Sequence, residues 1–133
     1  MAYRSTYLRP EKMILDLHHI QIAIPKDQED TARAFYGGIL GFLEVEKPPA
    51  LRGRGGLWLK APHVQLHLGV EDPFRAAQKA HPGFRVVSLQ AAMSHLEASG
   101  IAYQFDIDLP DLRRIYIKDP FGNRIELLEV ISS

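Results

Sequence analysis

The chain has 133 residues, of which 46% are hydrophobic and 24% are charged, a composition typical of one folded domain. Sixteen basic and sixteen acidic side chains cancel, so the net charge provides no general attraction to nucleic acid or to an anionic membrane. There is no cysteine, which excludes disulfides and thiolate metal sites. Any metal site must therefore use nitrogen and oxygen ligands.

Residues 1–12 show no hydrophobic period, and we expect them to form an N-terminal arm before a single domain over residues 13–133. No apolar run reaches the roughly 20 residues that a membrane span requires. The N-terminus also lacks the apolar core of a signal peptide. We therefore expect a cytoplasmic protein with no membrane partner.

The first half, about residues 17–70, predicts a strand, a helix and three more strands. Leu17–Ile24 alternates in the manner of a strand, and Asp27 with Asp30 resembles a capping box before a helix that ends at Gly41. The remaining predicted elements of this half are the helix over 28–40, the strands at 42–45, 57–60 and 63–70, and a loop rich in Pro, Arg and Gly over 48–56.

The second half, about residues 80–130, repeats this order after a polar linker with room for one helical turn. The predicted elements are a strand at 81–88, a helix at 89–99 and strands at 102–105, 113–118 and 124–130. Asp119-Pro-Phe-Gly-Asn123 is a strong tight-turn signal between the last two strands. Two β-α-β-β-β modules in an α+β fold are therefore predicted.

The predicted strands carry an unusual polar face. On the first strand Ile20, Ile22 and Ile24 share one side, and His19 and Gln21 share the other. The same alternation places further polar side chains together, namely Gln65, His67, His81, Arg85, Arg114, Tyr116 and Glu126. A solvated face also alternates, but it rarely carries so many metal-capable groups. We therefore predict a cupped mixed sheet, with helices on its outer face and a polar cavity inside.

Four of these residues recur at similar spacing. His19 and His67 open and close the first half, and His81 and Glu126 open and close the second. Three imidazoles and one carboxylate are a suitable set for a divalent first-row metal. Without His67, the remaining three form the two-histidine, one-carboxylate set of non-haem iron.

Four stretches carry a resemblance to a known family: "LHHIQIAIP", "ARAFYGGILGF", "HPGFRVVSLQAAMSHLEASGI" and "YIKDPFGNRIELLE". Over about residues 17–130 the chain resembles the vicinal oxygen chelate superfamily, which includes glyoxalase I, extradiol dioxygenases and bleomycin-resistance proteins. The resemblance implies metal ligation by His19, His67, His81 and Glu126. It also implies homodimers, often with a cavity built from strands of two chains.

The resemblance further implies a divalent-metal-dependent lyase or isomerase of the glyoxalase type. Its metal would be zinc, nickel, manganese or iron, and its small substrate would chelate the ion through adjacent oxygens and react through an enediolate or oxyanion. Glu126, or a metal-bound hydroxide that it helps to position, would move the proton, and Tyr116 would donate to the oxyanion. Gln21 and Arg114 are predicted to contact the substrate, while Trp58 is either a cavity wall with the same role or part of the core.

Two other functions stay open. One is Fe(II)-dependent dioxygenation through His19, His81 and Glu126. The other is a metal-free protein that binds a small molecule, as in drug resistance by sequestration. One departure from glyoxalase I is visible, because that enzyme has carboxylates at the last-strand position of both halves and this chain has His67 in the first. Among the other histidines, His18 is expected to face the apolar side of its strand.

Overall fold

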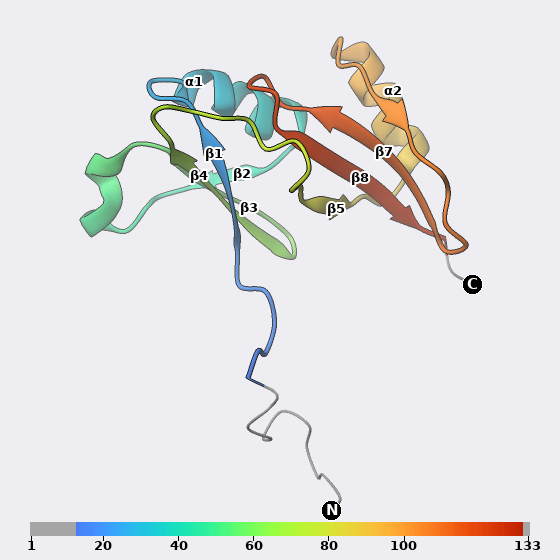
Figure 1. The fold of residues 1–133 in the computed structure, drawn as a ribbon, viewed down its shortest axis with the longest axis horizontal. Coiled ribbons are helices and arrows are strands. Elements are labelled where there is room, and N and C mark those ends of the chain that lie inside the picture. The colour runs from blue at the N-terminus through green and yellow to red at the C-terminus, as the bar shows by residue number, and fades with distance from the viewer. Residues whose placement is uncertain (1–12, 132–133) are drawn as a thin grey trace, which may run out of the picture.

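The computed structural model describes residues 13–131, so the predicted N-terminal arm lies outside the described residues. The first module contains β1 (Ile20–Ile24), α1 (Glu29–Ala32), the π-helix η2 (Arg33–Ile39), β2 (Leu43–Val45), the 3₁₀-helix η3 (Pro49–Arg54), β3 (Leu57–Ala61) and β4 (Val64–Val70). The second contains β5 (Gly83–Arg85), α2 (Leu89–Ala98), β6 (Gln104–Phe105), β7 (Leu112–Lys118) and β8 (Arg124–Val130). The predicted pair of β-α-β-β-β modules is confirmed (Figure 1).

Each module forms its own mixed sheet. The strand orders are β1-β4-β3-β2 and β5-β8-β7-β6. In both sheets the first strand runs parallel to the last strand of its module, and the other neighbours are antiparallel. The predicted mixed sheet is therefore divided into two four-stranded sheets of the same topology.

The helices cover the apolar face of the sheets, as predicted. Figure 1 shows α1 beside the first sheet and α2 beside the second. Phe35 and Tyr36 of η2 belong to the same buried cluster as Leu59 and Leu66 of the first sheet and Ile125 of the second. Burial of these side chains supplies the main driving force for folding. It also leaves the opposite, polar face of each sheet free.

The predicted helix over 28–40 contains an irregularity. It begins as α1 and continues as the π-helix η2, in which Leu40 N–H donates to the Phe35 carbonyl at 2.9 Å. Gly37 and Gly38 lie in this segment, and glycine favours the regular α-helix least among residues other than proline. The wider turn is a local adjustment of the kind that interrupts many helices.

The predicted strand over 81–88 is reduced to β5. Pro82 has no N–H to donate, although its carbonyl accepts from Glu126 N–H at 3.0 Å. Val87 is completely exposed. The linker over 71–80 contains no helical turn, and η3 occupies the segment where a loop was predicted.

A buried polar network joins the two modules at the predicted Asp119–Asn123 turn. Tyr36 Oη donates to Asp119 Oδ2 at 2.7 Å, and Asn123 Nδ2 donates to the same oxygen at 2.8 Å. Asn123 Nδ2 also donates to the Ala23 carbonyl, and its Oδ1 accepts from Ala77 N–H, both at 2.9 Å. Burial, together with the adjacent Asp119 carboxylate, raises the pKa of Tyr36. Hydrogen bonds of this turn therefore connect β1, η2 and the linker to the start of β8.

Candidate functional site

Three planar side chains form a row across the polar face of the first sheet. Trp58 stacks on His67 with ring centroids 4.0 Å apart and planes 1° apart. His19 stacks on the other side of His67, at 4.3 Å and 24°. The row follows from the strand order, because β4 lies between β1 and β3. We call His19, Gln21, Trp58 and His67 the first half-site.

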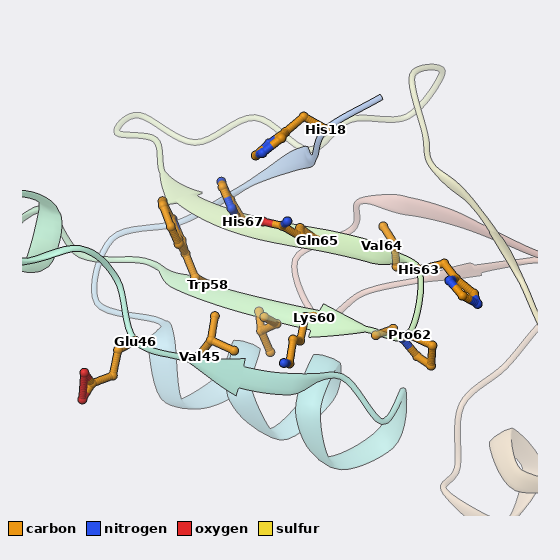
Figure 2. Close-up of a pocket in the computed structure, with 12 residues that line it drawn as sticks. His18, Val45, Glu46, Trp58, Lys60, Pro62, His63, Val64, Gln65 and His67 are labelled. Carbon is orange, nitrogen blue, oxygen red and sulfur yellow. The ribbon is translucent and has the colours of Figure 1, made fainter. Parts of the chain in front are cut away.

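A hollow of about 490 Å³ opens beside this row. Its lining residues are His18, Val45, Glu46, Trp58, Leu59, Lys60, Ala61, Pro62, His63, Val64, Gln65 and His67. Figure 2 shows Trp58 and His67 standing side by side in it, with His18 facing them. Trp58 lines this hollow and does not belong to the buried core. Gln21 pairs with His67 in register, but its amide lies over Gly69 and does not line the hollow.

The expectation for His18 is wrong. Its ring is exposed and lines the hollow, and its Nδ1 lies 2.9 Å from Nδ1 of His19. The physical reason is that β1 begins only at Ile20. The alternation within β1 therefore does not determine the direction of His18, which lies two residues before the strand.

His67 is the most buried histidine of the first half-site, with 7% of its surface exposed. Burial lowers its pKa, and the neighbouring imidazoles of His19 and His18 oppose its charged form further. The neutral ring that results carries a free lone pair. Metal ligation requires this form of histidine.

The polar face of the second sheet carries charged groups instead of stacked rings. His81 Nε2 lies 2.9 Å from Glu126 Oε1, and Arg114 Nη1 lies 3.6 Å from Glu126 Oε2. Tyr116 is opposite Glu126 in the β7–β8 register. We call His81, Arg114, Tyr116 and Glu126 the second half-site. Its Glu126 is buried, and burial of a carboxylate is costly unless partners of this kind surround it.

Neighbouring groups affect the pKa of Tyr116 and the ring orientation of His81. Partial burial raises the pKa of Tyr116, and the negative charge of Glu126 adds to the rise. The Tyr116 phenol therefore keeps its proton and can act as a hydrogen-bond donor. The other ring nitrogen of His81, Nδ1, lies 2.9 Å from the Lys79 carbonyl. That contact fixes the orientation of the imidazole toward Glu126.

The two half-sites occupy equivalent positions in their sheets. In the first sheet His67 is paired with Gln21 on one side and Trp58 on the other. In the second sheet Glu126 is paired in the same way with Gly83 and Tyr116. The predicted metal ligands are therefore brought together as two pairs, one on each sheet. Within residues 13–131, no cluster of three or more His, Asp or Glu side chains could hold a metal ion.

Sequence reasoning missed Asp106. Its Oδ2 lies 3.2 Å from Arg114 Nη2, which connects the loop after β6 to the second half-site. The only available signal was the alternation in "FDIDL", where apolar residues separate Asp106 from Asp108. The structure has just two residues of strand there, so the pattern was too short to interpret.

Comparison with known proteins identifies the class. The model of the Glyoxalase/Bleomycin resistance protein/Dioxygenase superfamily matches residues 16–127, and the chain belongs to this family. Among solved structures, a glyoxalase family protein from Bacillus anthracis is 43% identical and superposes with a TM-score of 0.85, with 88% of this chain and 96% of that chain covered. The resemblance found in the four sequence stretches is thus confirmed.

More distant structures share the fold. A fosfomycin resistance protein from Listeria monocytogenes is 19% identical with a TM-score of 0.71, with coverage of 86% of this chain and 91% of its own. A lactoylglutathione lyase from Agrobacterium tumefaciens is 24% identical with a TM-score of 0.62, with coverage of 83% and 91%. No curated protein matches the chain. In the described part of the chain, no helix has the length and apolar character to span a membrane.

Proposed function

We propose that the protein is a divalent-metal-dependent enzyme of the glyoxalase type whose site is completed by two copies of the chain. The observation that carries the proposal is the equivalence of the two half-sites. One sheet presents two imidazoles, and the other presents an imidazole and a carboxylate at matching positions. Facing half-sites of two subunits would combine these donors at one point, in a symmetric dimer.

The donor set fits a divalent first-row metal. His19 and His67 of one subunit would act with His81 and Glu126 of the other, giving three nitrogen ligands and one oxygen ligand. The contacts of His81 support this assignment. Its Nδ1 lies 2.9 Å from the Lys79 carbonyl, which would orient the ring, and its Nε2 lies 2.9 Å from Glu126 Oε1. The two proposed ligands of this half-site are therefore adjacent, with the ring oriented by a backbone carbonyl as in many metal sites.

The chain's own residues suggest how a substrate would react. A divalent metal supplies Lewis acidity, which polarises the oxygen atoms of a bound substrate. Glu126 is positioned to move a proton, and the Tyr116 phenol would donate to an oxyanion as it develops. Arg114 would bind the substrate beside them. Trp58 would exclude water from one wall, and Gln21 would contact the substrate from β1.

Exposed apolar side chains support the homodimer. Met13, Ile14, Leu15 and Leu17 precede β1 and are between 71% and 84% exposed. Four exposed apolar side chains within one short segment are available for association with another apolar surface. Because these residues lead directly into the first half-site, a second subunit that covered them would lie next to the proposed ligands.

A mixing experiment tests the shared site. His19→Ala and His81→Ala variants would be unfolded and refolded together, and bound nickel or zinc would be measured after dialysis. Neither variant alone should retain the metal. Random pairing should restore about a quarter of the sites, because half of the dimers are mixed and each mixed dimer has one intact site of two. Mixing His19→Ala with His67→Ala is the control, since both lesions lie in one half-site and no site is restored.

Metal analysis of the unmutated protein distinguishes the alternatives. Zinc, nickel or manganese in protein purified without chelator would support lyase or isomerase chemistry. Iron would favour dioxygenation through His19, His81 and Glu126. Absence of any bound metal, at concentrations that saturate ordinary metalloenzymes, would contradict the proposal and favour a metal-free binding protein.

A further inference from the structure

The guanidinium of Arg114 is held by several oxygen atoms at once. Its Nη2 lies 3.2 Å from Asp106 Oδ2, its Nε donates to the Ile107 carbonyl at 3.3 Å, and its Nη1 donates to Tyr116 Oη at 3.5 Å. The side chain of Arg114 is only 20% exposed. A guanidinium fixed in this way is preorganised and loses little further entropy when it binds a ligand.

Asp106 is itself fixed in position. Its Oδ1 accepts from Ile107 N–H at 2.7 Å, and Leu109 pairs with Leu112 across the tight connection to β7. The contact of Arg114 with Glu126, at 3.6 Å, is longer than a hydrogen bond. Asp106 therefore orients Arg114 through Nη2, while Nη1 faces Glu126 and the Tyr116 phenol.

A second guanidinium lies on the same face. The Cζ atom of Arg124 is 5.0 Å from the centroid of the Tyr116 ring, and that of Arg114 is 6.0 Å from it. Among residues 13–131 no carboxylate forms an ion pair with Arg124. The two guanidinium groups thus flank one phenol ring.

The polar face of the second sheet is cationic as a whole. The register places four positive side chains on it, namely Arg85, Arg114, Lys118 and Arg124. The negative groups beside them are Glu126 and Asp106. In the proposed site Glu126 would be engaged by the metal, which leaves a further excess of positive charge. Such a surface concentrates anionic ligands.

We infer that the substrate carries a carboxylate, that Arg114 and Arg124 bind this group beside Tyr116, and that Asp106 is the residue that positions Arg114. This inference rests on the proposed function, because the carboxylate would be bound next to the metal-chelating oxygens. A planar carboxylate matches the fork of N–H donors that a guanidinium presents. Asp106 would not contact the substrate itself, and its ion pair with Arg114 is the contact through which it would position that side chain.

A pair of matched probes tests the inference. Nickel-loaded protein would be titrated by calorimetry with acetohydroxamic acid, a small chelator, and with succinic monohydroxamic acid, the same chelator extended by a carboxylate. The ratio of their dissociation constants isolates the effect of the carboxylate. We expect roughly 10- to 100-fold tighter binding of the carboxylated probe, the range for hydrogen bonds to charged groups.

Five variants assign this preference to residues. Arg114→Gln and Arg124→Gln should each remove most of the preference, whereas Arg113→Gln, on the opposite face of β7, should leave it unchanged. Asp106→Asn should reduce the preference by roughly threefold to tenfold while acetohydroxamic acid binds as before. Asp106→Glu, which restores the charge, should recover part of it. If Asp106 only maintained the fold, Asp106→Asn would weaken the binding of both probes equally.

The outcomes separate the two proposals. If nickel and acetohydroxamic acid bind but the carboxylate gives no advantage, the inference is wrong and the proposed metal site stands. Equal loss of preference in Arg113→Gln would also overturn it, because the effect would then reflect general charge. If nickel does not bind at all, the proposed function fails and this inference fails with it.

Discussion

The two sheets have the same topology but present different chemistry at equivalent positions. The first sheet has His67 beside Trp58, two stacked rings with no carboxylate among them. The second has Glu126 beside Tyr116, with Arg114 in the same cluster. The two modules share the same strand pairing, but their side chains at equivalent positions differ.

The two half-sites provide different properties. The ring stack of the first half-site provides a rigid wall and a neutral imidazole, because buried His67 disfavours the charged form. The second half-site provides the charges, with a buried carboxylate held near a guanidinium. A homogeneous pair of half-sites would supply one property twice. In the proposed shared site, this difference would let the two half-sites supply different properties at one point.

The largest effect is expected when the carboxylate is removed from the second half-site. Glu126→Gln keeps the shape but loses the charge, so turnover should be abolished and nickel affinity should fall by more than roughly 100-fold, with a modest loss of fold stability. His67→Gln, the equivalent change in the first half-site, should cost less because it removes a neutral donor. Calorimetric titration with nickel checks both. Equal losses would contradict the asymmetry, and unchanged metal content and activity in Glu126→Gln would remove that residue from the mechanism.

The hairpin turns of the two sheets should also differ. Asn123→Ala in the second sheet removes a buried side chain with three hydrogen-bond contacts and should lower the free energy of unfolding by about 2–4 kcal/mol. His63→Ala in the corresponding turn of the first sheet removes an exposed ring and should change it by less than about 0.5 kcal/mol. Urea denaturation measures both. A similar decrease in the free energy of unfolding in both variants would show that the buried network stabilises the fold no more than an exposed turn residue does.

A smaller effect is expected from the ring stack. Trp58→Ala should lower the free energy of unfolding by about 1–2 kcal/mol, since the residue is half-buried and loses its stacking with His67. Trp58→Phe should retain part of the stack and of the stability. In the second sheet Tyr116→Phe should cost less than about 1 kcal/mol, because the phenol is only partly buried and loses a long contact with Arg114 and an interaction with Asp106. Thermal unfolding of the three variants at one pH provides the comparison.

The joint between the modules should respond to alkaline pH. The pKa of Tyr36 is raised in the folded state, so its contribution is complete below the unfolded value of about 10 and is lost as pH rises above it. The expected slope from this residue is about 1.4 kcal/mol per pH unit. Tyr36→Phe should be less stable near neutral pH and should show a flatter decline above pH 10. Parallel curves for the two proteins would exclude Tyr36 as the titrating group.

Local features of the fold were predictable from the sequence. The strand expected over 124–130 is observed as β8, Arg124–Val130, because a clear alternation follows a strong turn signal. The predicted tight turn at Asp119–Asn123 is likewise observed, between β7 and β8. Such features depend on periods and turns that lie within a short stretch of chain.

Features that depend on packing could not be predicted. Asp106 belongs to an irregular segment, and only the folded chain brings it next to Arg114. The direction of His18 depends on where β1 begins. The division of the proposed ligands into two pairs depends on how whole sheets are arranged, and no local pattern in the sequence records that arrangement.

The carboxamide of Asn123 has a consequence for attempts to alter this protein. It binds backbone atoms of β1 and of the linker and also contacts its own turn, so one side chain supports three segments that are distant in sequence. Residues that line the hollow, such as Lys60 and Gln65, make no contribution to that support. Libraries for directed evolution should therefore vary exposed residues of the hollow such as Lys60 and Gln65 and keep position 123 constant, so that new specificities are sampled on an intact scaffold.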